Sequence, residues 1–253
     1  MKLSELYAAF EERFPSSLSC DWDNDGIMCA LSLDSEVKKV LCVLDATMAA
    51  LEYAAENGYD TVISHHPMIF HPIGSVTPEN HIARRVIFAL KNNINVLSFH
   101  TRADAAKGGV NDLLAKALGI ENVTAFGDEE GDIGRVGHLE CETDVTCFAE
   151  KVKNALGCAT VTLAKASDRV KKVAVLGGSG KSFVSAAKAT GADVFVSGEI
   201  GFSNMNEAKE MGISLIEAGH YFTEDILCSL FSEILTSLGV ENGYYSSNTA
   251  VNI

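Results

Sequence analysis

The chain has 253 residues, of which 47% are hydrophobic and 21% are charged. These are ordinary values for a folded protein, and they exclude an extended disordered chain. The formal net charge of −14 argues against a nucleic acid or an anionic membrane as the main partner, because both require clustered Lys and Arg. A nucleotide substrate is not excluded, since bound divalent cations can locally reverse the sign of the field.

The first residues predict an amphipathic helix, with Leu3, Leu6, Phe10 and Phe14 at helical spacing. Glutamates interrupt the apolar run that a secretory signal would need. No segment approaches the roughly 20 apolar residues that span a bilayer. The seven cysteines are scattered and include no C-x-x-C pair, which is typical of reduced, mostly buried thiols. We therefore expect a cytoplasmic protein that does not enter a membrane.

Strand and helix patterns alternate along the first half of the chain. Short apolar runs rich in β-branched residues predict strands, and stretches of helix formers that end near Gly or Asn predict helices. The predicted strands are 40–44, 61–64 and 95–99, and the predicted helices are 46–57, 79–92 and 110–118.

The second half has the same alternation after a less regular stretch. The acidic, Gly-rich segment 126–137 favours a surface loop, and a small element is expected from a strand near 135–140, a helix near 144–156 and a strand near 159–164. Beyond it, the predicted strands are 172–176, 193–197 and 213–217, and the predicted helices are 181–190, 204–211 and 223–238.

This alternation predicts an α/β fold with two similar βαβ-type lobes, each built on a mostly parallel sheet. The expected organisation is a first lobe at 1–125, a small connecting αβ element at 126–170 and a second lobe at 171–253. Because no low-complexity linker separates the lobes, we expect them to pack as one body.

In parallel sheets, ligands bind beyond the carboxyl ends of the strands. His65 and His66 follow strand 61–64, Asp104 follows strand 95–99, and His220 follows strand 213–217. Glu224 lies four residues after His220, on the same face if a helical turn begins there. The five residues predict a metal site at this edge of the sheets.

The residue types indicate the chemistry of this site. Pro67 should end the strand at the two histidines, so that both imidazoles can serve one site. Imidazole and carboxylate ligands suit Zn²⁺, Mn²⁺, Fe²⁺, Co²⁺ or Ni²⁺, and a carboxylate such as Asp104 can bridge two ions. Five ligands cannot saturate two ions, so water completes the coordination, as a hydrolytic site requires. His100 could orient a ligand through its second ring nitrogen.

For each of two further loops, the sequence allows two interpretations. Asp23, Asn24 and Asp25 either contact a ligand or substrate near the metals or form a turn satisfied by its own side chains. Gly177 to Gly180 either form a tight turn between strand and helix, which we favour, or hold an anion on backbone N–H groups.

Six segments together resemble a known family, the NGG-interacting-factor-three-like (YbgI-type) dinuclear metal-centre proteins, also described as GTP cyclohydrolase I type 2 homologues. The matching segments are WDNDGIM (22–28), ISHHPMIF (63–70), SFHTRADAAKGGVND (98–112), VLGGSGKS (175–182), GADVFVSGEI (191–200) and IEAGHYFTE (216–224). The length is similar to that of the short form, without an inserted domain.

The resemblance implies that His65, His66, Asp104, His220 and Glu224 bind two metal ions, in agreement with the choice made from the residues. It also implies two α/β lobes and a toroidal homohexamer. The chain departs from the family pattern at Ile27 to Ala30, where a Gly usually closes the motif, and at His71, where many relatives have a basic residue. The second departure weakens an inference of phosphate binding there.

The leading hypothesis is a metal-dependent hydrolase that acts on a small nucleotide-like or phosphorylated substrate. The sequence shows no serine or cysteine nucleophile motif. The alternatives are a non-catalytic, ring-forming metal-binding or regulatory protein, and redox chemistry at a di-iron centre. The fold and the family name alone do not establish the chemistry.

Overall fold

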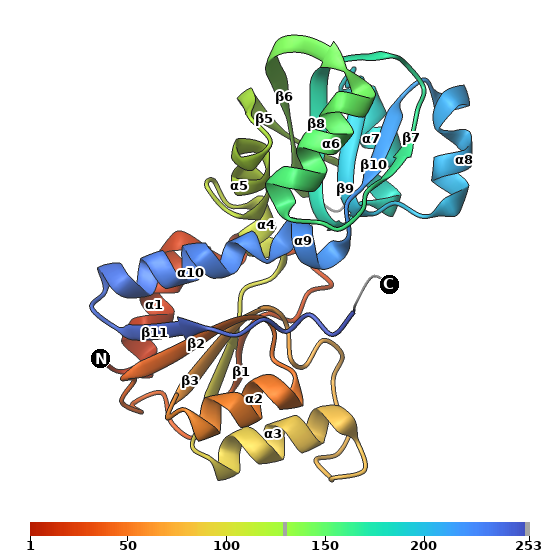
Figure 1. Cartoon of the computed structure of the whole chain (residues 1–253). Coiled ribbons are helices and arrows are strands. Elements are labelled where there is room, and N and C mark those ends of the chain that lie inside the picture. The colour runs from red at the N-terminus through yellow and green to blue at the C-terminus, as the bar shows by residue number, and fades with distance from the viewer. Residues whose placement is uncertain (129–130, 251–253) are drawn as a thin grey trace. The chain divides into compact units, whose positions relative to one another are not determined.

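The computed structural model describes residues 1–128 and 131–250, which fold as two compact units (Figure 1). The first unit consists of Met1–Ala106 and the C-terminal segment that begins at Leu227, and the second is Lys107–Ile226. The expected boundaries at residues 125 and 170 do not coincide with this division. The last strand joins the first sheet, whereas the strands between Lys107 and Ile226 form the second sheet.

The sheet of the first unit has the strand order β1-β4-β3-β2-β11. Its strands are β1 (Gly26–Cys29), β2 (Lys39–Asp45), β3 (Thr61–His66), β4 (Asn95–Ser98) and β11 (Glu241–Tyr244). All neighbours pair in parallel except β1, which is antiparallel to β4. The parallel centre β2-β3-β4 is the one that the sequence predicts, whereas the two edge strands were not expected.

Helices cover both faces of this sheet (Figure 1). They are α1 (Leu3–Arg13), the 3₁₀ turn η1 (Ser16–Leu18), α2 (Met48–Glu56), α3 (His81–Lys91), α4 (Thr101–Ala105) and α10 (Ile226–Ser237). On the face of α2 and α3, Leu51 and Val86 pack with strand residues such as Leu41 and Val62. The opposite face carries a cluster of aromatic rings from α1, α10 and the end of β4, namely Phe10, Phe14, Phe99 and Phe231.

Side chains that cap the first turn determine where several helices begin. Thr47 Oγ1 accepts a hydrogen bond from the N–H of Ala50 at the start of α2. Asn80 Oδ1 accepts hydrogen bonds from the N–H groups of Ile82 and Ala83 at the start of α3. Such caps satisfy backbone N–H groups that have no partner within the helix. They explain why these two helices start two residues later than their apolar patterns predict.

The second unit is built on a six-stranded sheet with the order β5-β6-β8-β9-β10-β7. Its strands are β5 (Ile120–Asp128), β6 (Gly131–Asp144), β7 (Thr162–Ala164), β8 (Arg169–Ser179), β9 (Val194–Glu199) and β10 (Ser214–Glu217). The central strands β8, β9 and β10 are parallel, and the flanking pairs are antiparallel. The prediction of an α/β fold with two sheets of mostly parallel strands is therefore confirmed.

The expected surface loop at 126–137 is wrong for its described residues, which belong to the strand pair β5 and β6. Between the acidic and glycine residues of this segment lie three apolar side chains that are buried, Phe126, Ile133 and Val136. Gly134 is required here, because a Cβ atom would lie 2.5 Å from the ring of Phe126. Residues 129 and 130 of the expected loop lie outside the described part.

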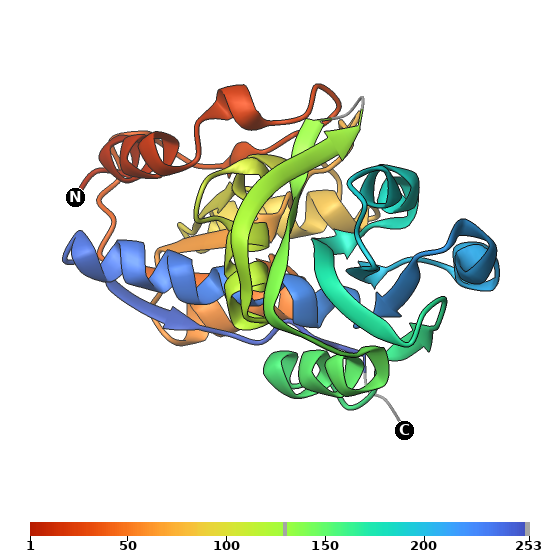
Figure 2. The same cartoon turned by 90° about the horizontal axis from the view of Figure 1, so that it is seen from above.

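The helices of the second unit are α5 (Val110–Ala117), α6 (Val145–Leu156), the 3₁₀ turn η2 (Lys181–Phe183), α7 (Val184–Ala189), α8 (Phe202–Met211) and α9 (His220–Glu224). In Figure 2, α6 lies on one face of the sheet and α7 on the other. Val173, Val175, Val194 and Val196 pack with α6 in one apolar cluster. The predicted helix 223–238 is divided in two, since α9 ends at Glu224 and α10 begins at Ile226.

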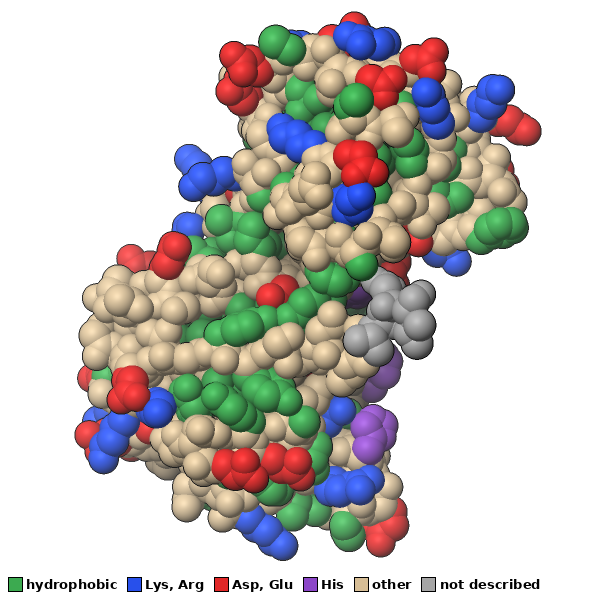
Figure 3. Space-filling model, in the orientation of Figure 1, with side chains coloured by type: hydrophobic (Ala, Val, Ile, Leu, Met, Phe, Trp, Pro, Cys, Tyr) green, Lys and Arg blue, Asp and Glu red, His purple; other side chains and the backbone are tan. Residues whose placement is uncertain are grey.

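Acidic and basic side chains are interspersed over the face that Figure 3 shows. In the described part of the chain, no helix has the length and apolar character needed to cross a membrane.

Candidate metal centre

The structure places the predicted ligands at the ends of strands or in the short helices that follow them. In the first unit, His65 and His66 are the last residues of β3, and Asp104 lies in α4, directly after β4. In the second unit, His220 and Glu224 are the first and last residues of α9. One detail differs from expectation, because β3 includes both histidines. Its pairing with β2 extends to His66, and the strand ends only at Pro67.

His65 is fully buried and has a defined ring orientation. Its Nδ1 atom lies 2.9 Å from the carbonyl oxygen of Phe99. A carbonyl oxygen can only accept, so Nδ1 carries a hydrogen, and Nε2 is the ring nitrogen that can bind a metal. Nε2 in turn lies 3.7 Å from Oδ1 of Asp104. A ring nitrogen and a carboxylate oxygen thus converge in a buried place, as two ligands of one cation would.

His66 shows the same arrangement with a different acceptor. Its Nδ1 atom is 2.8 Å from Oδ1 of Asp45, the last residue of β2. Hydrogen bonds of this kind to the second ring nitrogen are usual for histidines that bind metals, because they set the tautomer and orient the ring. Asp45 was not identified from the sequence. Asp45 reaches His66 because the register of β2 and β3 pairs these two residues.

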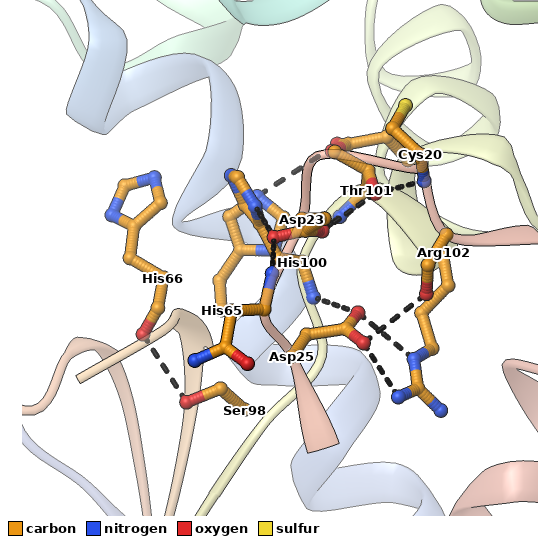
Figure 4. A network of polar contacts seen from close by, with 12 residues as sticks. Cys20, Asp23, Asp25, His65, His66, Ser98, His100, Thr101 and Arg102 are labelled. Carbon is orange, nitrogen blue, oxygen red and sulfur yellow. Dashed lines mark hydrogen bonds and ion pairs between the residues drawn. The ribbon is translucent and has the colours of Figure 1, made fainter. Parts of the chain in front are cut away.

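His100 lies beside the two predicted histidine ligands. Its Nδ1 atom is 2.9 Å from Oδ1 of Asp23. The histidines 65, 66 and 100 each offer one ring nitrogen, and these three nitrogens lie within 4.8 Å of one another. Figure 4 shows the three side chains together with Asp23. In its described part, the first unit therefore contains a group of histidines that could hold a metal ion.

The loop with Asp23 and Asp25 anchors the segment that carries His100, as the dashed lines in Figure 4 show. Asp23 Oδ2 accepts hydrogen bonds from the N–H and the hydroxyl of Thr101, at 3.0 and 2.6 Å. Asp25 Oδ2 accepts from the N–H of His100 at 3.2 Å and from Nε of Arg102 at 2.8 Å. The loop is not a turn satisfied only by its own side chains. It holds the start of α4 beside the histidines.

The carboxyl group of Asp23 predicts a measurable pH dependence of stability. Burial alone would raise the pKa of Asp23, but hydrogen bonds from His100 and Thr101 and the charge of His100 lower it from 3.8 to about 2. A carboxyl group with a lowered folded-state pKa stabilises the fold above its unfolded-state pKa, and that contribution is lost as the pH falls through the folded-state value. The difference corresponds to about 2 kcal/mol, lost between about pH 4 and pH 2.

We expect the variant Asp23→Asn to be less stable than the parent at pH 6 by about 2 kcal/mol, and this gap to narrow as the pH falls below 4. Urea unfolding of both proteins at pH 6, 4 and 3 measures it. Other acidic residues titrate in both proteins, so only the difference between them reports on Asp23. A gap that is constant with pH would contradict the assignment.

In the second unit, α9 brings His220 and Glu224 onto one helical face. Nε2 of His220 lies 3.0 Å from Oε2 of Glu224, the i, i+4 arrangement that the sequence predicts. Nδ1 of His220 lies 3.4 Å from Oε1 of Glu199, at the end of β9. Glu224 is buried, while His220 is partly exposed. This pair also offers an imidazole and a carboxylate side by side.

The glycines before α7 support Glu224 and do not form an anion-binding turn. Gly177 and Gly178 belong to β8, and their N–H groups donate to Asn111 Oδ1 and Thr223 Oγ1 at 2.7 and 3.0 Å. These donors are therefore already used within the protein. A Cβ atom at Gly178 would lie 2.0 Å from Oε1 of Glu224. The absence of a side chain at Gly178 thus leaves the space that the carboxylate occupies.

This close approach gives a prediction for Gly178→Ala. The added methyl group must displace the Glu224 carboxylate, so we expect metal affinity to fall by about 10- to 100-fold, the usual range for the loss of support to a ligand. Gly157→Ala is a matched control, since its φ of 68° resembles the 64° of Gly178 and its Cβ would meet nothing within 4 Å.

Both alanine variants should lose about 1–2 kcal/mol of stability through left-handed backbone strain. Only Gly178→Ala should also bind metal more weakly. Titration calorimetry with Mn²⁺ or Zn²⁺ on both variants separates these effects. Equal metal affinity in the two variants would show that Glu224 does not need this space.

The donor set fits a divalent transition metal. Imidazole nitrogens and carboxylate oxygens are the ligands that Zn²⁺, Mn²⁺, Fe²⁺, Co²⁺ and Ni²⁺ accept together. Because Nδ1 of His65 and of His66 contacts an acceptor, Nε2 is the ring nitrogen of each that can bind a metal. The structure thus contains His, Asp and Glu groups that could bind metal.

Comparison with known proteins gives the family. The sequence model described as Duf34/NIF3 (NGG1p interacting factor 3) matches residues 1–249. The chain belongs to the Duf34/NIF3 family. A relative from Clostridium perfringens named GTP cyclohydrolase 1 type 2 homolog is 32% identical over 229 residues, which cover 88% of this chain and 87% of the relative.

Solved structures of Duf34/NIF3-like proteins share the whole fold. Staphylococcus aureus protein SA1388 superposes with a TM-score of 0.88 at 26% identity, covering 100% of this chain and 99% of that one. Reduced HcgD from Methanocaldococcus jannaschii gives a TM-score of 0.85 at 31% identity, covering 96% and 97%. The family predicted from the six sequence segments is therefore confirmed.

Proposed function

We propose that this protein is a metal-dependent hydrolase that acts on a small nucleotide-like or phosphorylated substrate. Two divalent ions would be bound by five side chains, His65, His66, Asp104, His220 and Glu224. The observation that carries the proposal is the state of the histidines in the first unit, where an acceptor holds Nδ1 of both His65 and His66. This orientation presents Nε2 of each ring as the atom that would bind a cation.

The protein's own groups have separable roles in this proposal. Phe99 and Asp45 orient the two imidazoles, and Asp104 adds a carboxylate 3.7 Å from Nε2 of His65. His220 and Glu224 contribute a second imidazole–carboxylate pair. When bound, divalent ions would acidify water and polarise the bond to be cleaved. Five ligands leave coordination positions for water and for substrate.

A substrate screen of the metal-loaded protein tests the hydrolase proposal. Nucleotides, phosphoesters and cyclic amides would be incubated with the parent protein and with His66→Ala. We expect turnover of at least one class by the parent, abolished by chelation and reduced by at least about 100-fold in the variant. Tight metal binding without any turnover would contradict hydrolysis and favour a metal-binding or regulatory role.

We also propose that the protein assembles as a homohexamer in the cytoplasm. The family resemblance supports the ring. The reducing compartment is supported by the seven cysteines, which are scattered along the sequence and include no C-x-x-C pair. Light scattering coupled to size-exclusion chromatography should give six times the 27.0 kDa chain mass. A monomeric mass at micromolar concentration would contradict the assembly.

A further inference from the structure

Two exposed aromatic side chains lie beside the histidines of the first unit. Trp22 is 49% exposed and Phe70 is 38% exposed. Their ring centroids are 6.0 Å apart, and the planes meet at 63°, an edge-to-face contact. One exposed apolar residue is ordinary on a protein surface, but two that touch each other from separate loops form a patch. We call Trp22 and Phe70 the aromatic pair.

The aromatic pair is continuous with the histidine cluster. The ring of His100 lies 6.1 Å from the ring of Trp22 and 6.1 Å from the ring of Phe70. It also lies 5.2 Å from His65 and 5.6 Å from His66. The rings form a series from exposed Trp22 and Phe70, through half-buried His100, to fully buried His65. A molecule that bound at the imidazole nitrogens would also contact these aromatic side chains.

The two loops that carry the pair are held in place. Asn24 Nδ2 donates to the carbonyl oxygen of Ile69 at 2.5 Å, which ties the residues next to Trp22 and Phe70 to each other. Asp23 accepts hydrogen bonds from His100 and Thr101. These bonds hold the two loops next to each other and to the start of α4, which lowers the entropic cost of ordering the loops when a ligand binds.

We propose that the aromatic pair is a subsite for the planar ring of the substrate, a nitrogen heteroaromatic ring such as a nucleobase. This inference rests on the proposed function, because it places a substrate beside the same metal-binding histidines. Every nucleobase has a π-face that can stack on Trp or Phe, and such stacking does not depend on a particular pattern of hydrogen bonds.

A phosphate group would instead require Lys, Arg or free backbone N–H groups. Beside Phe70 the chain has His71, whose ring lies 4.6 Å from that of Phe70. The surface at Trp22 and Phe70 is thus aromatic, and the ring of the substrate is the part that these two side chains recognise.

Trp22 is the only tryptophan in the chain, so its fluorescence reports directly on the subsite. The metal-loaded full-length protein would be titrated with AMP, GMP, CMP and UMP, and with ribose 5-phosphate, which has the same sugar phosphate but no base. We expect saturable quenching by at least one nucleotide and none by ribose 5-phosphate. No difference between all four nucleotides and ribose 5-phosphate would overturn the proposal.

The variant Phe70→Ala measures the contribution of the second ring. We expect Kd for the quenching nucleotide to rise by about 5- to 140-fold, which is the 1–3 kcal/mol typical of one stacked base. Phe202→Ala is the matched control, because Phe202 is 81% exposed but lies in the second unit. Its Kd should stay within about twofold of the parent value.

Three outcomes separate this subsite from other roles. Quenching without turnover supports the subsite and contradicts hydrolysis. Turnover with unchanged kcat/KM in Phe70→Ala, and without quenching, supports hydrolysis and overturns the subsite. A Phe70→Ala protein that loses its metal or changes its oligomeric mass also overturns it, since the pair would then be a structural or subunit contact.

Discussion

Replacing Arg102 by methionine should lower the free energy of unfolding by about 3–5 kcal/mol, the usual cost of removing one partner of a buried ion pair. The Arg102 side chain is 2% exposed, and that of Asp25 is 4% exposed. Methionine keeps much of the volume but leaves the Asp25 carboxylate buried without its cation. Such a charge is far more costly in the interior than in water.

The geometry around Arg102 explains the size of this effect. Its Nε and Nη2 atoms donate to the two oxygens of Asp25 at 2.8 and 2.6 Å, and Nη1 donates to Glu11 at 2.6 Å and to the carbonyl oxygen of Phe14 at 3.3 Å. Burial by itself lowers the pKa of Arg102, but the hydrogen bonds and charge of Asp25 outweigh it and raise the pKa above its ordinary value. The guanidinium therefore joins α1, the 23–25 loop and α4.

Urea unfolding at neutral pH measures the effect of Arg102→Met. Arg169→Met is the control, since Arg169 forms an exposed ion pair with Glu142 and should change stability by less than about 1 kcal/mol. A change below about 1 kcal/mol for Arg102→Met as well would contradict the structural role assigned to this network.

Removing the metal should destabilise the protein by several kcal/mol. An ion that binds only the folded chain stabilises it by RT ln(1 + [L]/Kd), which is about 4 kcal/mol per ion when the free ion is at a thousand times Kd. A loss of that size lowers the midpoint of thermal unfolding by about 8–16 °C for a chain of this length. Without the ion, the carboxylates and imidazole nitrogens of the proposed site would lie close together with no cation between them.

Thermal unfolding with free Mn²⁺ or Zn²⁺ held at a buffered concentration, and again with excess chelator, measures this shift. The variant Asp104→Ala should show a much smaller difference between the two conditions, because it lacks one of the carboxylates proposed as ligands. A parent protein whose midpoint is the same with and without the ion would contradict metal-linked stability.

The centres of both sheets could be predicted because their strands are short apolar runs separated by helix patterns. The runs at 40–44, 61–64 and 172–176 form β2, β3 and the middle of β8. β11 could not be predicted, because Glu241–Tyr244 has little strand character and is held by parallel pairing with β2. The strand pair β5 and β6 could not be predicted, because glycine and acidic residues surround the buried Phe126 and Ile133.

Strand ends and i, i+4 spacing led to the choice of His65, Asp104, His220 and Glu224, and their binding of metal stays a prediction. The groups that support these side chains could not be predicted. The acceptors Asp45, Asp23 and the carbonyl of Phe99 depend on which strands are neighbours and on their register, which periodicity does not specify. The space at Gly178 depends on the approach of α9 to β8 and has no sequence signal of its own.

The most direct test of the central claim is the metal content per chain of protein purified without oxygen, measured by elemental analysis for the parent, His65→Ala and Glu224→Ala. We expect about two divalent ions per chain in the parent and a clear loss in both variants, one substituted in each unit. Less than one ion per chain, unchanged by either substitution, would contradict the metal centre and leave these histidines as structural residues.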